Sequence, residues 1–166
     1  MPFSLHGAMK FLADFLNQAH TGEQAVVGLY PEEFAGLRVR VSFGRGMPAH
    51  IPWIAFLADG MEVRNRHYPN YLYYKKNKKL VLVFGISEEN QHHRQWRADT
   101  VKGKPRVREV IQNPYRYGDS YVYKIYDVRE QNGVRQICYG NQQVSEEKLK
   151  NDLEQICEYY ERSLSL

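Results

Sequence analysis

The feature that most limits the possible folds is a series of strand-length apolar stretches, each bounded by turn residues. Residues 37–43 alternate strictly between apolar and polar side chains, which predicts a strand with one buried and one open face. The open face carries Arg38 and Arg40. Residues 51–57 form a continuous apolar run of strand length. Further strands are predicted over residues 68–75, 80–85, 120–128 and 134–139.

Helices are expected at both ends of the chain. Apolar residues recur at intervals of three and four over residues 4–20, which predicts a helix with one apolar face. Ser145 is a suitable N-cap for a last helix, and the acidic residues after it suit the positive end of that helix. A short helix is expected over residues 105–112. Residues 1–166 are therefore predicted to form a single α+β domain, with a mixed, largely antiparallel sheet flanked by N- and C-terminal helices.

The charge balance favours a polyanionic partner. The formal net charge is +4 and the sequence pI is about 9.0. Cationic surface gains free energy when it displaces the counterions of phosphates. Cys138 and Cys157 are too few for a disulfide framework and are expected to be buried free thiols. We find neither a signal peptide nor an apolar run of the roughly 18 residues that a membrane span needs, and so expect a cytoplasmic protein.

Aromatic residues are the more unusual part of the composition, with 13 Tyr, 7 Phe and 2 Trp. Basic residues interleaved with aromatic rings suit nucleic acids, because cations neutralise phosphates and ring faces stack on bases. The pattern is equally typical of an ordinary sheet with arginine and tyrosine on its wet face. Four segments that can meet at one end of the sheet carry such residues, namely Arg38, Arg40, Arg45, Trp53, Tyr68, Tyr71, Tyr73, Lys75, Tyr115, Arg116 and Tyr117.

Motifs for catalysis and cofactor binding are absent or weak. The chain contains no phosphate-binding Gly-x-x-x-x-Gly-Lys motif and no Cys-x-x-Cys or His-Glu-x-x-His motif. His92 and His93 are adjacent, so in a strand their side chains would point in opposite directions. Glu146 and Lys148 form the Glu-x-Lys fragment of many nucleases, but on a helix they diverge by about 200°. We therefore expect no cofactor, no metal ion and no catalytic residue in this domain.

Four blocks of sequence follow one another in an order that is hard to obtain by chance. They are residues 37–46 (LRVRVSFGRG), 51–57 (IPWIAFL), 68–75 (YPNYLYYK) and 80–87 (LVLVFGIS). Together with Gln95 and Trp96, these blocks resemble the N-terminal DNA-binding domain family of McrB, the GTP-driven, DNA-recognising subunit of McrBC restriction systems. The resemblance is dense over residues 37–97 and thinner from Pro114 to the end of the chain.

The resemblance implies a function. Domains of this family bind double-stranded DNA that holds a modified cytosine (5-methyl, 5-hydroxymethyl or N4-methyl) after a purine, and rotate that base into a protein pocket. Extrusion of a base exposes its modification to the protein, at an unstacking cost of a few kcal/mol. The resemblance also implies that GTP hydrolysis belongs to a following AAA+ domain and DNA cleavage to a separate nuclease subunit.

The resemblance also implies which residues form the site, because each functional position of the family's pattern can be matched to one position of this sequence. In the family's pattern the flipped-base pocket falls on Trp53, Tyr68, Leu72 and Tyr117. Trp53 and Tyr117 would clamp the ring, Leu72 would contact a methyl group, and the Tyr68 hydroxyl would bond the base edge. The residues expected to contact the DNA backbone are Arg38, Arg40, Ser42, Lys75 and Arg116.

Arg45 departs from the best-known member of the family, which has an aromatic residue between the two glycines. We predict that Arg45 enters the gap left by the flipped base and bonds the orphaned guanine; the alternative is a phosphate contact. Two other functions stay open. One is a nuclease or glycosylase that acts on modified DNA and uses Asp127 or Glu146. The other is an RNA-binding or protein-interaction module built on the tyrosine-rich sheet.

Overall fold

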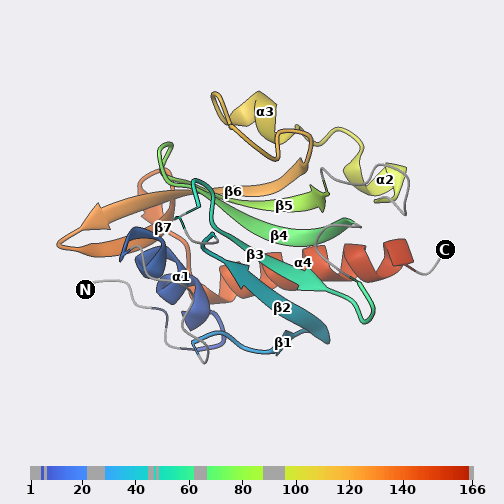
Figure 1. Ribbon diagram of the computed structural model, residues 1–166, viewed down its shortest axis with the longest axis horizontal. Helices are drawn as coiled ribbons and strands as arrows, with labels where there is room; N and C mark the ends of the chain where they lie inside the picture. The colour runs from blue at the N-terminus through green and yellow to red at the C-terminus, as the bar shows by residue number, and fades with distance from the viewer. Residues whose placement is uncertain are drawn as a thin grey trace.

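A computed structural model describes residues 5, 7–21, 29–44, 47, 49–61, 67–87 and 96–164. Within these residues, eight antiparallel strands form one sheet, and their order in space is their order in the chain (Figure 1). The strands are β1 (Glu33–Phe34), β2 (Leu37–Ser42), β3 (Trp53–Leu57), β4 (His67–Tyr74), β5 (Lys79–Ile86), β6 (Tyr121–Gln131), β7 (Val134–Tyr139) and β8 (Gln142–Gln143). The helices are α1 (Lys10–Thr21), α2 (Ala98–Val101), α3 (Val107–Val110) and α4 (Glu146–Leu164). The predicted α+β class is confirmed.

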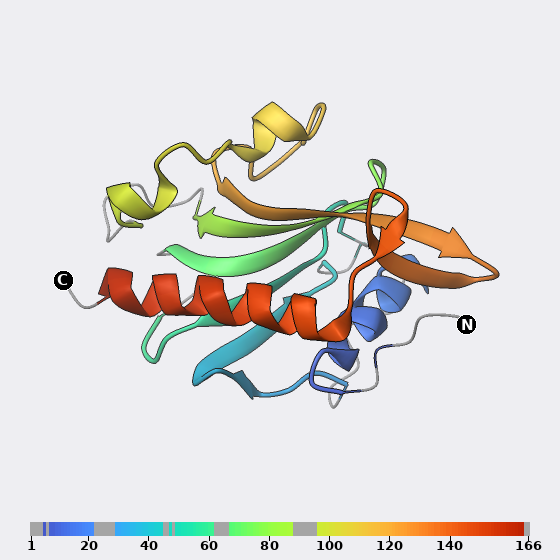
Figure 2. The same cartoon turned by 180° about the vertical axis from the view of Figure 1, so that it is seen from behind.

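The two long helices cover one face of the sheet. Figure 2 shows α4 lying along this face, with α1 beside its N-terminal end. The apolar stripe of α4 includes Leu149, Leu153, Ile156 and Tyr160, all fully buried in the larger of two core clusters. Each such side chain contributes about 1.5–3 kcal/mol when it is withdrawn from water. This packing fixes which face of the sheet stays free for other contacts.

A smaller core cluster lies on the opposite face, beneath α3. It contains Leu72 and Tyr74 of β4, with Val81 and Val83 of β5 and Val107 of α3. Strand β4 is therefore covered on both faces and is buried along its whole length. At β4 and β5 the molecule has three layers, whereas α3 and its neighbouring loops leave the outer face of β2 and β3 uncovered (Figure 1).

Alternation along β4 corrects part of the predicted constellation. Tyr71 and Tyr73 are 0% and 1% exposed and pack in the larger cluster, under α1 and α4. Leu72, between them, points to the other face, because successive side chains of a strand alternate. Tyr71 and Tyr73 therefore cannot share a nucleic-acid surface with the arginines of β2.

Element boundaries follow the sequence pattern with a few exceptions. Ser145 caps α4 as predicted, since its Oγ accepts a hydrogen bond from the Lys148 amide at 3.1 Å. The Asn132–Gly133 turn has positive φ at both residues, as the sequence predicts for a tight hairpin. Helix α2 lies in a stretch for which no helix was predicted, and the two-residue strands β1 and β8 carry no alternation long enough to be recognised.

Both cysteines are free and buried, as predicted, and burial raises the pKa of the Cys157 thiol. Among the described residues, no helix has the length and apolar character required to cross a membrane.

Candidate nucleic-acid interface

The pairing of the strands places several predicted site residues side by side on the outer face of the sheet, which is the face opposite to α1 and α4. Ser42 pairs with Trp53, and Trp53 pairs with Leu72 on the next strand. One step along, Arg40 pairs with Ala55, which in turn pairs with Asn70. Directly paired residues point to the same face of a sheet. The arginines of β2 therefore share a face with Trp53 and Leu72, away from α1 and α4.

Three of the four predicted pocket residues meet at the smaller core cluster. Leu72 is 1% exposed within this cluster, and the half-buried side chains of Trp53 and Tyr117 pack against it. Tyr68 is 7% exposed and belongs to the larger cluster. Tyr68 lies four residues before Leu72 on β4, so the two side chains point to the same face. Trp53 packs against both clusters and so connects Tyr68 with Leu72 and Tyr117. We call Trp53, Tyr68, Leu72 and Tyr117 the aromatic site.

Two arginines stand on the same face as the aromatic site. Arg38 and Arg40 are exposed, and the guanidinium of Arg38 donates a hydrogen bond to the Met61 carbonyl at 2.6 Å. Ser42 is less available, because its Oγ accepts a hydrogen bond from the Gly44 amide at 3.3 Å. Ser42 thus holds the first turn of the β2–β3 connection.

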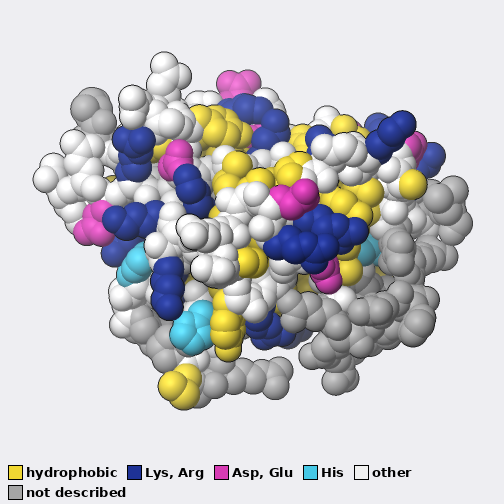
Figure 3. Space-filling model, turned by 90° about the horizontal axis from the view of Figure 1, so that it is seen from above, with side chains coloured by type: hydrophobic (Ala, Val, Ile, Leu, Met, Phe, Trp, Pro, Cys, Tyr) yellow, Lys and Arg dark blue, Asp and Glu magenta, His cyan; other side chains and the backbone are white. Residues whose placement is uncertain are grey.

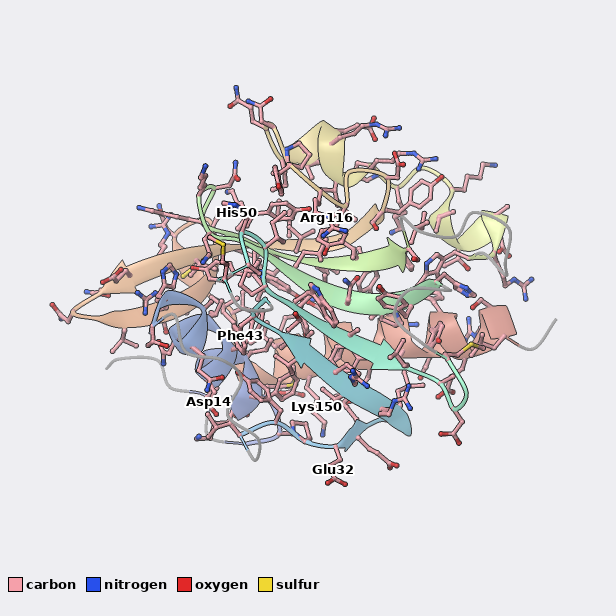
Figure 4. All side chains as sticks on the ribbon, viewed as in Figure 1. Asp14, Glu32, Phe43, His50, Arg116 and Lys150 are labelled. Carbon is pink, nitrogen blue, oxygen red and sulfur yellow. The ribbon has the colours of Figure 1, made fainter. Side chains whose placement is uncertain are left out.

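The other two predicted backbone contacts come from different parts of the fold. The Lys75 ammonium donates to the Ala19 carbonyl at 3.3 Å, near the C-terminal end of α1, where a cation suits the helix dipole. The Arg116 guanidinium lies 4.9 Å from the centre of the Tyr117 ring. Figure 4 shows Arg116 and His50 over the same end of the sheet, above β4 and β5.

The loop over residues 113–118 has an unusual backbone. Asn113, Tyr115 and Tyr117 have φ values of 51°, 66° and 67°, in the left-handed region. Each costs roughly 1–2 kcal/mol in a residue other than glycine. The Tyr74 hydroxyl helps to hold the loop by donating to the Arg116 carbonyl at 2.9 Å. Strain that persists in this way is common at ligand-binding sites. Here it sends Tyr117 into the aromatic site and leaves Tyr115 77% exposed.

Asn70 is a candidate site residue that the sequence reasoning missed. It lies on β4 between Tyr68 and Leu72, is 5% exposed, and its Oδ1 has no hydrogen-bond partner among the described residues. Room for this oxygen depends on Gly85, where an added Cβ would lie 2.5 Å from it. The sequence did contain a signal for Asn70. It is a polar residue two positions from both Tyr68 and Leu72, and residues two apart in a strand point to the same face.

Arg45, like His92 and His93, lies outside the described residues, so its predicted entry into the DNA gap stays a prediction. The preceding Gly44 has a φ of 105°, a conformation that favours glycine and begins the turn.

The two carboxylates considered for catalysis make structural contacts. Asp127 forms an ion pair with Lys79 and accepts a hydrogen bond from the Gly140 amide at 3.3 Å. The hydrogen bond from Lys79 is the largest cause of a lowered pKa at Asp127. Glu146 accepts hydrogen bonds from the amides of Gly7 at 2.8 Å and Met9 at 3.2 Å, and so ties the start of the chain to α4. Within the described residues, no three His, Cys, Asp or Glu side chains are grouped to hold a metal ion.

Comparison with known proteins agrees with the resemblance drawn from the sequence. The family described as "MrcB-like, N-terminal domain" matches residues 10–164. A curated relative, the type IV methyl-directed restriction enzyme EcoKMcrB subunit of Escherichia coli (strain K12), is 39% identical over 116 residues. That alignment covers 67% of this chain but only 25% of the relative. Since the family match extends over nearly the whole chain, this protein belongs to the MrcB-like N-terminal domain family, the N-terminal domain of McrB proteins.

Proposed function

We propose that this chain binds double-stranded DNA containing a modified cytosine and rotates that base out of the duplex into the aromatic site. The observation that carries the proposal is the meeting of Trp53, Leu72 and Tyr117 on the outer face of the sheet, although they come from three separate segments. The name of the Escherichia coli relative, which describes it as methyl-directed, supports the same substrate class.

The energy balance of base flipping suits two aromatic walls. Unstacking and unpairing one base costs a few kcal/mol. Stacking on one aromatic side chain returns about 1–3 kcal/mol, so Trp53 and Tyr117 together offset most of this cost. Leu72 supplies apolar contact for a methyl group, which is worth about 0.8 kcal/mol for each carbon buried. The preferred modifications would be 5-methyl, 5-hydroxymethyl or N4-methyl, on a cytosine that follows a purine.

The surrounding charges suit the DNA backbone. Arg38 and Arg40 are exposed beside Trp53, where they would neutralise phosphates on either side of the flipped base. Arg116 and Lys75 extend the cationic surface toward the 113–118 loop and α1. These contacts would set affinity for all duplexes, whereas the aromatic site would set the preference for modified DNA.

The proposal assigns recognition, not catalysis, to this chain. The chain aligns with about a quarter of the Escherichia coli subunit, whose remaining length offers space for other activities. We propose that GTP hydrolysis resides in an AAA+ domain and DNA cleavage in a partner nuclease subunit, as in McrBC-like restriction systems. The domain itself would need no cofactor.

Fluorescence anisotropy tests the proposal directly. One duplex carries a single central purine–5-methylcytosine step, its twin is unmodified, and both are titrated at two salt concentrations. We expect tighter binding to the methylated duplex at both salts, and we expect Trp53→Ala and Tyr117→Ala to abolish the difference. Tyr159→Ala is the matched control, since Tyr159 is a half-buried tyrosine near an arginine, Arg162 at 5.8 Å, but lies on α4.

The outcomes separate the competing functions. Equal binding to methylated, hydroxymethylated, N4-methylated and unmodified duplexes, with affinity that collapses at high salt, would refute the proposal and leave only a cationic surface. Metal-dependent cleavage of modified plasmid by the isolated chain would favour a nuclease. Stronger competition by single-stranded RNA than by modified duplex would favour RNA binding.

A further inference from the structure

A cavity of about 860 Å³ lies next to the aromatic site, between the β4–β5 hairpin and the 113–118 loop. Its volume is within the range of about 300–1,000 Å³ that is usual for sites of small ligands. Among the described residues, its lining includes no carboxylate. The cationic side chains that line it are Lys75, Lys76, Arg108 and Arg116. Such a lining favours an anionic ligand. We call this space the Tyr115 cavity.

An exposed aromatic ring forms part of the wall. Tyr115 is 77% exposed, and the only ring that it meets among the described residues is His50, at 5.2 Å between centroids and 58° between planes. Most of the Tyr115 ring therefore remains accessible to a ligand. An accessible aromatic ring combined with cations is the arrangement by which proteins hold single nucleotides of a DNA strand.

The cations of the cavity differ in what they already contact. Arg108 forms an ion pair with Asp119, and Arg116 lies over Tyr117. Lys76 is exposed on the hairpin turn and has no ion-pair partner in the part of the chain that the structure describes. Figure 3, which looks onto the molecule from above, shows Lys and Arg side chains next to hydrophobic ones, with some Asp and Glu side chains among them. Lys76 is thus the cation best placed to receive a phosphate.

The cavity and the aromatic site share structural parts. Tyr74 lines the cavity, packs in the same cluster as Leu72, and holds the loop through its bond to the Arg116 carbonyl. Tyr115 and Tyr117 are two residues apart, so their Cα atoms are separated by no more than about 7 Å. When a DNA strand holds one base at Tyr117, the adjoining nucleotide is therefore within reach of Tyr115.

We propose that the Tyr115 cavity is a second nucleotide subsite, which holds the nucleotide next to the flipped cytosine on the same strand. Its base or sugar lies against Tyr115, and its phosphate lies near Lys76. This assignment rests on the function proposed above. A free mononucleotide offers the same chemistry, but the shared loop and Tyr74 connect the cavity to the aromatic site and favour the DNA strand as the source.

Binding of variants measures the contribution of the subsite. Tyr115→Ala is expected to lower affinity for the methylated duplex about tenfold, whereas Tyr115→Phe keeps the ring and retains wild-type affinity. The alanine occupies the left-handed backbone at the same cost as tyrosine, so thermal stability should not change.

Lys76→Ala should reduce the slope of log affinity against log salt concentration by about one, and Lys150→Ala, a control on α4, should leave this slope unchanged. Figure 4 shows Lys150 at a distance from His50 and Arg116.

Photocrosslinking locates the neighbouring nucleotide independently of affinity. Duplexes carry 5-iodouracil 3′ to the 5-methylcytosine or, so that the preceding purine is kept, 8-bromoadenine 5′ to it, and crosslinked peptides are identified by mass spectrometry. Crosslinks to Tyr115 or His50 support the subsite. Crosslinks confined to other segments, together with Tyr115→Ala binding within twofold of wild type, overturn it.

Two further results keep this proposal distinct from the proposed function. If the wild-type chain does not prefer methylated DNA, the proposed function fails, and crosslinking on the unmodified duplex still supports the cavity or excludes it. If 5-iododeoxyuridine monophosphate crosslinks to Tyr115 without DNA and the duplex never reaches this residue, the cavity binds a free nucleotide and its assignment to the DNA strand is overturned.

Discussion

Gly85 is the position where a single methyl group should damage both the sheet and the aromatic site. A Cβ at this residue would lie 2.5 Å from the Tyr68 carbonyl oxygen and 2.5 Å from Asn70 Oδ1. The Asn70 amide can rotate away, but the Tyr68 carbonyl belongs to β4, and Gly85 pairs directly with Tyr68 in the sheet. On the other strand, the Gly85 carbonyl accepts a hydrogen bond from Trp96 Nε1 at 3.0 Å. Neither strand can move without disturbing its other contacts.

The magnitude follows from these contacts. Overpacking in a close-packed core costs about 1–3 kcal/mol. The gain from replacing glycine by alanine within a strand is roughly 0.5–1 kcal/mol. We expect Gly85→Ala to lower the free energy of unfolding by about 1–2 kcal/mol, because the backbone oxygen cannot rotate out of the way. For a domain of this size that loss corresponds to a fall in Tm of roughly 2–8 °C. Displacement of Tyr68 should also weaken the preference for methylated duplex.

Calorimetry and anisotropy on the same preparation test this reasoning. Gly103→Ala is the control, because its added Cβ meets nothing within 4 Å and only the left-handed φ of 76° is penalised. It should lose about 1–2 kcal/mol of stability for this reason, with no change in DNA preference. If Gly85→Ala melts at the wild-type temperature and keeps the wild-type preference, the contact with Tyr68 is easily relieved and the reasoning is wrong.

Three further predictions concern the face that carries the helices. Tyr71→Phe should raise stability by about 1 kcal/mol in urea denaturation, because the buried Tyr71 hydroxyl has no partner among the described residues; a loss of stability would reveal an unrecognised bond. Asp152→Asn should cost about 2–3 kcal/mol, since this buried carboxylate accepts hydrogen bonds from Lys148 at 2.6 Å and Tyr126 at 2.8 Å, and an unchanged denaturation midpoint would contradict this role. Burial lowers the pKa of His20, and the nearby cations Arg135 and Lys75 lower it further. As the pH falls, the His20 imidazole of the unfolded chain therefore takes up a proton at a higher pH than that of the folded chain. Tm should therefore fall as the pH drops below about 6.5, and His20→Gln should flatten this part of the profile; an unchanged slope would show that other groups cause it.

The positions of the longer strands along the chain are largely readable from the sequence. Strict alternation over residues 37–43 predicts both β2 and its open face, on which Arg38 and Arg40 are found. The Asn132–Gly133 pair predicts the β6–β7 hairpin, because this dipeptide readily adopts the positive φ that the turn needs. Periodicity and turn chemistry are local properties, so local sequence is enough to reveal them. A two-residue strand such as β8 is too short to show an alternation of apolar and polar residues. It forms because the neighbouring strand β7 offers hydrogen-bond partners.

The candidate site is only partly readable in this way. Aromatic and basic residue types were visible, and the resemblance selected Trp53, Leu72 and Tyr117. The sequence could not show that Tyr71 and Tyr73 face the helices, because β4 is apolar on both faces and its pattern does not distinguish them.

The sequence by itself determined the positions of the longer strands, the terminal helices, the excess of positive charge and the family of this chain, since each depends on residue identity and spacing along the chain. The tertiary structure decided which side chains of β4 lie beside Trp53, how the strained 113–118 loop separates Tyr115 from Tyr117, and where the cavity lined by lysine and arginine opens. These features depend on contacts between segments up to about 60 residues apart. Such contacts form only when packing of the whole domain offsets the entropy of closing the intervening loops.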